Sequence, residues 1–384
     1  MPSLDELIRP GVTVAFGDGV GMPAMVLGEL SRAAANVGDV RLLLGWTLGA
    51  LDDLDVAAFG RVDTTMSGFA LRRLVDRGDV GYIPARMGTL PALVRDVLRP
   101  DVLIASVVAG PDGHRFASEV GWMRAAVDAG AVVAAVERPA LPRCDAGPPL
   151  PADRVVVIGS SDAPALAVPP ADITDDHRAI GEGIARLIPE GAVIQFGPGT
   201  IAEAACTALD RPVRVASGLL SDPVVGLDRR HLLIGQPRAA YLAGTAVLYD
   251  WADGRPLLHP CDVTHAPGPL GALGAPFVAI NTALEIDSDG QVNVETAGGS
   301  TIGGIGGHPD FTYTGASAAG GLSIIAVTSR SRRGEPTLVE RLEGPVTTPS
   351  HDVDVVVTER GIADLRGLSR PERRAALARL WSLA

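Results

Sequence analysis

GAVIQFGPGTIAEAACTAL, residues 191–209, combines three local signals in a row. Gly191 to Phe196 is a short apolar run typical of a buried strand. The Gly-Pro-Gly of residues 197–199 predicts a tight turn. Ile201 to Leu209 is rich in alanine, which favours a helix. A strand, a glycine turn and a helix in this order predict an α/β fold with a mainly parallel sheet.

The same alternation extends in both directions along the chain. Proline-rich segments at residues 142–151 and 164–170 predict a surface crossing, so we place a boundary near residue 172. The chain is then expected to form two similar α/β domains, residues 1–172 and 173–384. The expected strands are Val12–Phe16, Val40–Leu44, Val80–Ile83, Asp101–Val108 and Ala131–Val136, and the expected helices are Pro23–Ala35, Pro91–Leu98, Glu119–Ala129, Asp175–Leu187 and Arg370–Leu383.

Composition excludes several classes of function. The chain has 384 residues, of which 20% are charged, and a formal charge of −12 without a basic patch, which argues against nucleic acid as a partner. Its apolar runs stop near nine residues, whereas a membrane span needs about 20. Charged residues near the start argue against a secretory signal, so we expect a cytoplasmic protein with no membrane partner. Lysine is absent, which excludes Schiff-base chemistry.

The three cysteines predict no metal site. Cys144, Cys206 and Cys261 are widely separated, and no cysteine or histidine pair has the spacing of zinc ligands. We therefore expect reduced cysteines with a structural role.

Three glycine-rich turns mark places where a ligand could approach the backbone. They are residues 17–21, 197–199 and 303–307. Glycine allows close approach and lets backbone N–H groups face an anion. In open α/β sheets such turns follow the carboxyl ends of strands, where ligands bind. Tight turns in a glycine-rich chain remain the alternative interpretation.

Four motifs in the second half are more specific. They are NTALEIDSDGQVNVE (281–295), GIGGHPDF (304–311), SIIAVTS (323–329) and VVVTERGIADLRG (355–367). In order and spacing they resemble the acetyl-CoA hydrolase/CoA-transferase family, which includes 4-hydroxybutyrate CoA-transferase. The resemblance implies two open α/β/α domains of the class I CoA-transferase type, facing each other across a cleft. It also implies an acyl-CoA substrate, with coenzyme A as a substrate moiety and no permanently bound cofactor, and a homodimer.

The resemblance also implies a glutamate nucleophile, which forms an acyl-glutamyl anhydride and then a glutamyl-CoA thioester. The matching segment here is ASGLLSDP (216–223), and Gly218 occupies the nucleophile position. In addition, Pro198 stands where the family pattern implies a main-chain N–H for the oxyanion hole, and proline has no N–H. The motifs that carry the fold thus match the family pattern, whereas the motifs expected at the catalytic site differ from it.

The candidate catalytic residues are His308, Asp222 and Ser217. A histidine can act as a base near neutral pH, and the two others flank Gly218. Loop hydrogen bonding for His308, and a turn role for Asp222 and Ser217, remain open alternatives. A relocated nucleophile at Glu203 is a further alternative. The residues expected to contact coenzyme A are Gly197, Pro198, Gly199, Gly304, Gly306 and Gly307.

These observations favour an enzyme that acts on an acyl-CoA or a related acyl thioester without a glutamyl-CoA intermediate. Hydrolysis of the thioester, or hydrolytic C–C cleavage of a β-keto acyl-CoA, fits the loss of the nucleophile. His308 or Asp222 would then activate water. The alternatives are a CoA-transferase with a relocated nucleophile, a biosynthetic acyltransferase or cyclase, and a non-catalytic CoA-binding protein.

Overall fold

The computed structural model describes residues 4–170 and 172–382. The chain folds into two compact units. The first unit contains the described residues up to Val168, together with Ala240–Asp262 and Thr301–Gly304. The second contains Pro169–Ala239, Val263–Ser300 and the rest of the chain from Ile305. The chain leaves the first unit after Val168 and later returns to it twice. The division into domains 1–172 and 173–384 stays a prediction.

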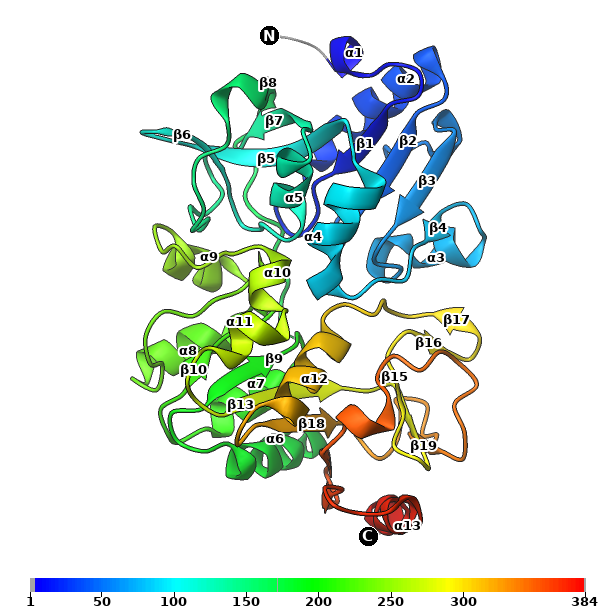
Figure 1. Ribbon diagram of the computed structural model, residues 1–384, viewed down its shortest axis with the longest axis vertical. Helices are drawn as coiled ribbons and strands as arrows, with labels where there is room; N and C mark the ends of the chain where they lie inside the picture. The colour runs from blue at the N-terminus through cyan, green and yellow to red at the C-terminus, as the bar shows by residue number, and fades with distance from the viewer. Residues whose placement is uncertain (1–3, 171, 383–384) are drawn as a thin grey trace. The chain divides into compact units, whose positions relative to one another are not determined.

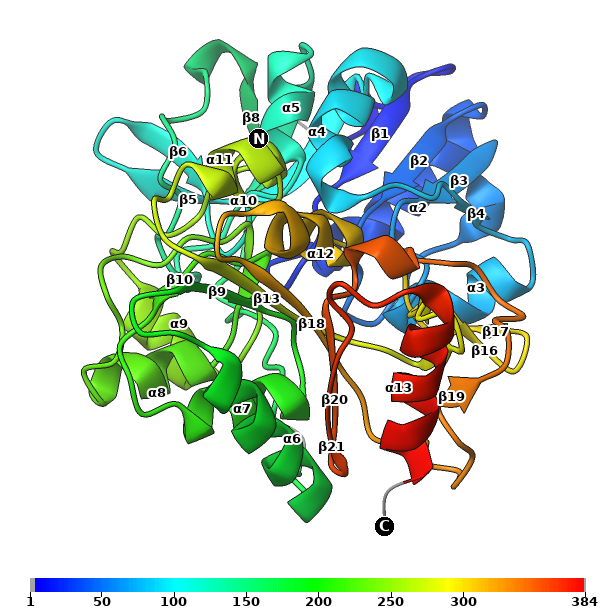
Figure 2. The same cartoon turned by 60° about the horizontal axis from the view of Figure 1, so that its bottom comes forward.

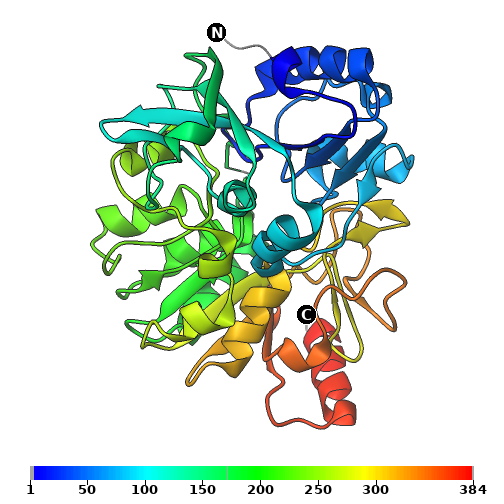
Figure 3. The same cartoon turned by 45° about the horizontal axis from the view of Figure 1, so that its top comes forward.

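The first unit is built on an eight-stranded sheet (Figure 1). All pairs are parallel except the hairpin of β5 with β6. Helix α2 (Leu27–Val37) packs against this sheet (Figure 3), and its Leu30 belongs to the same buried apolar cluster as Phe16 and Leu42 of the strands. In spatial order the strands are β4 (Gly81–Tyr82), β3 (Arg61–Thr64), β2 (Arg41–Leu44), β1 (Thr13–Phe16), β5 (Val102–Gly110), β7 (Val132–Glu137) and β8 (Val155–Ser160), with β6 (Gly113–Phe116) paired to β5.

The second unit is built on a six-stranded sheet, parallel except for its last strand. Figure 2 shows helices α6 (Asp175–Leu187) and α7 (Thr200–Ala208) on one face of this sheet and α12 (His308–Ser317) on the other. In spatial order the strands are β10 (Arg214–Val215), β9 (Val193–Phe196), β13 (Phe277–Thr282), β18 (Leu322–Ala326), β20 (Val355–Thr358) and β21 (Gly361–Asp364).

A glycine allows α6 and α7 to pack closely. A Cβ on Gly181 of α6 would lie 2.5 Å from the carbonyl carbon of Ala204 of α7. Real Cβ atoms do not approach a backbone this closely, so only glycine fits at position 181. Thr174 caps the amino end of α6, and its side chain accepts a hydrogen bond from the N–H of His177.

The predicted α/β class with a mainly parallel sheet is confirmed in both units. The strand at 191–196 and the helix at 201–209 appear as β9 and α7. The helix predicted from Glu119 is shorter and begins only at Met123 (α5, Met123–Asp128). The reason is that residues 118–121 bond instead to the chain at 240–242, for example through the N–H of Val120 and the carbonyl of Ala240 (2.9 Å). The C-terminal helix, α13, spans Arg370–Ser382, and Leu383 lies outside the described residues.

Within the described ranges, no helix is both long enough and apolar enough to cross a membrane. The same residues contain no group of three or more histidine, cysteine, aspartate or glutamate side chains placed to hold a metal ion. Cys144, Cys206 and Cys261 are free and buried. Burial raises the pKa of the Cys206 thiol to about 12.

Candidate active site in the second unit

The segment around Gly218 is held by a buried serine at the carboxyl end of β9. The Ser217 hydroxyl donates to the carbonyl of Phe196, the last residue of β9, at 2.8 Å. Its N–H donates to the carbonyl of Arg238 at 2.9 Å. The hydroxyl and the N–H of Ser217 are therefore both hydrogen-bonded to backbone carbonyls. These two bonds position the adjacent Gly218.

An imidazole fills the space into which a side chain at position 218 would extend. A Cβ on Gly218 would lie 2.6 Å from Nε2 of His265 and 3.3 Å from Cε2 of Phe311. Gly307 also lies against the imidazole of His265, because a Cβ on Gly307 would lie 2.8 Å from Nε2. The ring therefore lies against two glycines, and neither position can carry a side chain while His265 stays in place.

His265 makes polar and aromatic contacts with its neighbours. It is buried, with 2% of its surface exposed. Its Nδ1 lies 2.9 Å from Oγ1 of Thr264. Its ring centroid lies 4.7 Å from that of Phe311 on α12, with the planes tilted by 39°. The sequence signalled His265 only indirectly, because a missing side chain at 218 raises the question of what fills the space.

His308 begins α12 and uses both ring nitrogens within the fold. Nδ1 lies 2.7 Å from the hydroxyl of Thr348, and Nε2 lies 3.1 Å from the carbonyl of Thr282, the last residue of β13. A carbonyl only accepts, so Nε2 carries the hydrogen and Nδ1 accepts from the hydroxyl. Burial lowers the pKa of His308 to about 4, and the ring is neutral near pH 7. These contacts favour a role in positioning α12.

Two carboxylates lie near each other at the amino ends of two helices. Asp222 precedes α8 (Pro223–Arg229), and Glu203 lies in the first turn of α7. Desolvation, followed by the negative charge of Asp222, raises the pKa of Glu203. Both side chains are partly exposed. Asp222 thus lies four residues beyond Gly218 and acts electrostatically on Glu203.

The predicted coenzyme A turns have different surroundings. Gly199 precedes α7 with a φ of 118°, a conformation that favours glycine, and Pro198 before it is exposed. A Cβ on Gly197 would meet nothing within 4 Å. In the turn at 303–307, Gly306 and Gly307 belong to the second unit, whereas Gly304 belongs to the first. A Cβ on Gly304 would lie 2.5 Å from Sδ of Met66, so this glycine serves close packing.

The first glycine turn, residues 17–21, encloses buried carboxyl groups. Glu119 Oε2 accepts from the N–H of Gly21 (3.1 Å) and from the Ser118 hydroxyl (2.8 Å). A Cβ on Gly19 would lie 2.8 Å from the same oxygen. Burial raises the pKa of Glu119 to about 8. The glycines here make room for an internal side chain, which is the alternative interpretation of this turn.

Asp18 joins distant segments of the first unit. Its Oδ2 accepts from the N–H of Trp46 (3.0 Å), from Nε1 of Trp122 (3.0 Å) and from the hydroxyl of Tyr241 (3.3 Å). Its Oδ1 is buried and has no hydrogen-bond partner among the described residues. Burial raises the pKa of Asp18 to about 6. Asp18 and Glu119 thus form a buried acidic pair with a structural role.

Comparison with known proteins places these features in a family. Residues 244–380 match the acetyl-CoA hydrolase/transferase C-terminal domain. Succinyl-CoA:cyclohexane-1-carboxylate CoA transferase from Geobacter metallireducens is 30% identical over 339 residues, covering 83% of this chain and 77% of that protein. The chain belongs to the acetyl-CoA hydrolase/CoA-transferase family. It is accordingly an enzyme of this superfamily, whose members use coenzyme A as a substrate.

Other relatives in this family extend over nearly the whole chain. The 4-hydroxybutyrate coenzyme A transferase of Clostridium kluyveri is 27% identical over 95% of this chain and 89% of its own length. Among solved structures, RipA from Yersinia pestis superposes with a TM-score of 0.91 at 24% identity, covering 99% of this chain and 93% of that one. The 4-hydroxybutyrate CoA-transferase of Porphyromonas gingivalis gives a TM-score of 0.79 with the same identity and coverage. These structures support the α/β fold of the family.

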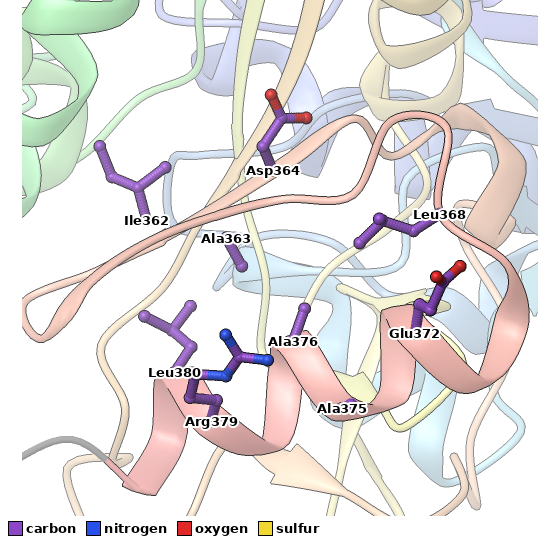
Figure 4. Close-up of a pocket in the computed structure, with 9 residues that line it drawn as sticks. All are labelled: Ile362, Ala363, Asp364, Leu368, Glu372, Ala375, Ala376, Arg379 and Leu380. Atoms are coloured by element: carbon purple, nitrogen blue, oxygen red, sulfur yellow. The ribbon is translucent and has the colours of Figure 1, made fainter.

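A separate hollow of about 460 Å³ lies between β21 and α13 (Figure 4). Apolar residues such as Ala363, Leu368 and Ala376 line most of it. Its charged members are Asp364, Glu372 and Arg379, and Asp364 is already paired with Arg366 at 2.6 Å. The lining has no histidine, cysteine or serine, so we place the candidate active site of this family member around Gly218 and not here.

Proposed function

We propose that this enzyme transfers the acyl group of an acyl-CoA to water, without a glutamyl-CoA intermediate. The reaction is hydrolysis of the thioester, or hydrolytic C–C cleavage when the substrate is a β-keto acyl-CoA. The observation that carries the proposal is the pair Gly218 and His265. The family resemblance implies a carboxylate at 218, and here an imidazole nitrogen stands 2.6 Å from the Cβ position instead.

The surroundings of Gly218 also support a change in chemistry. A glutamate side chain at position 218 requires His265 to move. Substituting Gly218 alone would therefore not restore the nucleophile that the family resemblance implies. Pro198 supplies no N–H to an oxyanion. Loss of one such donor typically costs about 2.7–4 kcal/mol of transition-state stabilisation. A transferase that retained the family route would carry both deficits.

The test for thioester hydrolysis is release of free coenzyme A, measured with a thiol reagent, from short and branched acyl-CoAs without any carboxylate acceptor. C–C cleavage of a β-keto acyl-CoA instead yields a carboxylic acid and a shorter acyl-CoA, which chromatography detects. We expect release that continues for many turnovers and incorporation of one ¹⁸O atom from labelled water into the acid product. Release that requires added acetate or succinate would contradict the proposal. Full activity in both His308→Ala and Asp222→Ala would remove these two residues as bases while leaving the reaction class intact.

A second candidate is a CoA-transferase whose nucleophile is Glu203. The observation in its favour is a partly buried carboxyl group in the first turn of α7, in the same unit as Gly218. Against it, desolvation and the charge of Asp222 raise the pKa of Glu203, which disfavours the ionised form that a nucleophile needs. Intact-mass detection of an acyl or coenzyme A adduct that disappears in Glu203→Gln would support transfer. Tight coenzyme A binding without turnover on any substrate would instead indicate a binding protein.

A further inference from the structure

We propose that the hollow between β21 and α13 binds a monocarboxylic acid with a linear apolar chain, and that Arg379 holds its carboxylate (Figure 4). The hollow shares no lining residue with the site around Gly218. The inference does not rest on the hydrolytic function, because it requires no reaction at either place. Three observations carry it: an apolar hollow of ligand size, a free cation at its edge, and lining carboxylates placed away from that cation.

The walls of the hollow suit a hydrocarbon chain. Its volume is about 460 Å³, within the range of about 300–1,000 Å³ that is usual for small-molecule sites. Ile362 has 38% of its surface exposed and Leu368 is partly buried, so part of the apolar wall is open to a ligand. Removing an alkyl chain from water onto this wall favours binding. The apolar lining residues are Ile362, Ala363, Leu368, Ala375, Ala376 and Leu380.

Arg379 supplies a positive charge at one end of the hollow. It follows Ala375 and Ala376 by one helical turn, so these three residues share a face of α13. Figure 4 shows its guanidinium extending from α13 toward β21. The side chain is exposed, and within residues 4–170 and 172–382 no group forms an ion pair or hydrogen bond with this guanidinium. An arginine fork can bind a carboxylate through two parallel N–H···O bonds.

The two carboxylates of the lining lie away from Arg379. Asp364 points away from α13 in Figure 4 and is already paired with Arg366 at 2.6 Å. Glu372 accepts hydrogen bonds from the N–H and the hydroxyl of Ser369, at 2.7 and 2.5 Å. It precedes Arg379 by seven residues, which is about 10 Å along a helix axis. A ligand whose carboxylate is bound by Arg379 therefore needs a neutral tail, because a second carboxylate near Glu372 would meet like charge.

The separation of these two ends sets the length of the tail. An extended alkyl chain advances about 1.3 Å for each carbon–carbon bond of about 1.5 Å. About eight carbons therefore span the distance from Arg379 to Glu372. Octanoate is the matching probe, since shorter acids leave part of the apolar wall uncovered.

The experiment titrates butyrate, hexanoate, octanoate and suberate, the dicarboxylate of the same length, into the full chain by isothermal calorimetry. Each added CH₂ should strengthen binding by up to about fourfold, because it removes more apolar surface from water. We expect octanoate to saturate a single site. We expect suberate to bind at least about tenfold more weakly, because its second carboxylate approaches Glu372.

Two variants test the position of the site. Arg379→Gln should weaken octanoate binding by about 10–100-fold, because hydrogen bonds between charged groups are lost. Ala376→Leu places a larger side chain in the hollow and should abolish saturable binding. Arg370→Gln is the matched control, because this exposed arginine begins the same helix and does not line the hollow. Circular dichroism confirms that each variant is folded.

The outcomes are distinct. Octanoate binding that survives both Arg379→Gln and Ala376→Leu would place the acid elsewhere, for example around Gly218, and would overturn the proposal. Equal affinities for butyrate and octanoate, or for octanoate and suberate, would contradict the assigned chemistry. A wild type that binds no octanoate would also overturn it. If Ala376→Leu then lowers the mass in analytical ultracentrifugation, the hollow is a contact between copies of this chain.

This test is separate from that of the proposed function. Arg379→Gln should release coenzyme A at the rate of the wild type, whether or not a carboxylate acceptor is needed. Failure of the hydrolytic function therefore leaves the octanoate result unchanged, and failure of octanoate binding leaves the hydrolytic function unchanged.

Discussion

The carboxyl group of Glu119 accepts a hydrogen bond from the N–H of Gly21 at 3.1 Å, deep inside the first unit. Burial outweighs this bond and raises the pKa of Glu119 to about 8, against 4.5 for an ordinary glutamate. Asp18 and Arg138 are the charged groups whose fields reach it, with opposite effects. The folded protein therefore holds a proton on Glu119 at neutral pH.

The sign of the resulting pH dependence follows from proton counts. Between pH 4.5 and 8 the unfolded chain has lost the Glu119 proton and the folded chain keeps it, so the free energy of unfolding falls as pH rises. We expect Glu119→Gln to remove this decline and to stabilise the protein at pH 8 by a few kcal/mol at most, since a tenfold change in proton affinity corresponds to about 1.4 kcal/mol. Urea unfolding at pH 5, 6.5 and 8 measures the free energy of unfolding of the wild type and the variant. Glu182→Gln, on the exposed face of α6, is the control, and an equal effect there would refute the assignment.

Substitution of Gly218 by alanine tests the packing of His265. The φ of Gly218 is outside the left-handed region, so alanine is compatible with the backbone and only space opposes it. We expect Gly218→Ala to destabilise the protein by about 1–3 kcal/mol, as overpacking does. Adding His265→Ala should recover most of that loss. Additive effects of the two changes in a double-mutant cycle would contradict contact between these residues.

His308 should set part of the stability profile in acid. Its folded pKa is about 4 and its unfolded value is about 6.5, so the unfolded chain binds the extra proton first as pH falls. Stability contributed by His308 is therefore lost between pH 6.5 and 4. We expect His308→Gln to flatten this limb in thermal unfolding scans. It should also lower stability at pH 7 by about 1–3 kcal/mol, because Thr348 and Thr282 lose their partner. An unchanged limb would show that another group titrates there.

Removal of the Asp222 charge should change the pKa of Glu203. The negative charge of Asp222 contributes to the raised pKa of Glu203, after desolvation. Asp222→Asn should therefore lower the pKa of Glu203 while leaving part of the shift in place. Carbon-detected NMR titration of labelled glutamate carboxyl groups measures this directly. Asp228→Asn, further along α8, serves for comparison, and equal shifts in the two variants would exclude a specific pair.

Local signals were sufficient to predict the class of fold. Strands such as β9 and β5 are mostly apolar runs followed by glycine or polar turns, and that pattern lies within a few residues. The helix predicted from Glu119 was too long because residues 118–121 bond to the distant chain at 240–242. No local pattern reports such a partner.

The candidate site was predictable only in part. Gly218 and Ser217 follow from the family motif, and Ser217 turned out to hold the segment through Phe196. His265 was missed, because its contact with Gly218 joins segments far apart in the sequence. His308 was singled out for its residue type, whereas its partners, Thr282 and Thr348, come from other parts of the chain.

The return of Ala240–Asp262 to the first unit has a consequence for biosynthesis. Residues up to Val168 leave the ribosome first, but Asp18 takes one of its three hydrogen bonds from Tyr241. Trp46 likewise packs edge-on against the ring of Tyr241, 5.5 Å between centroids. A nascent chain that ends before residue 240 lacks the tyrosine that contacts Asp18 and Trp46. The first unit is therefore completed only after much of the second has been translated.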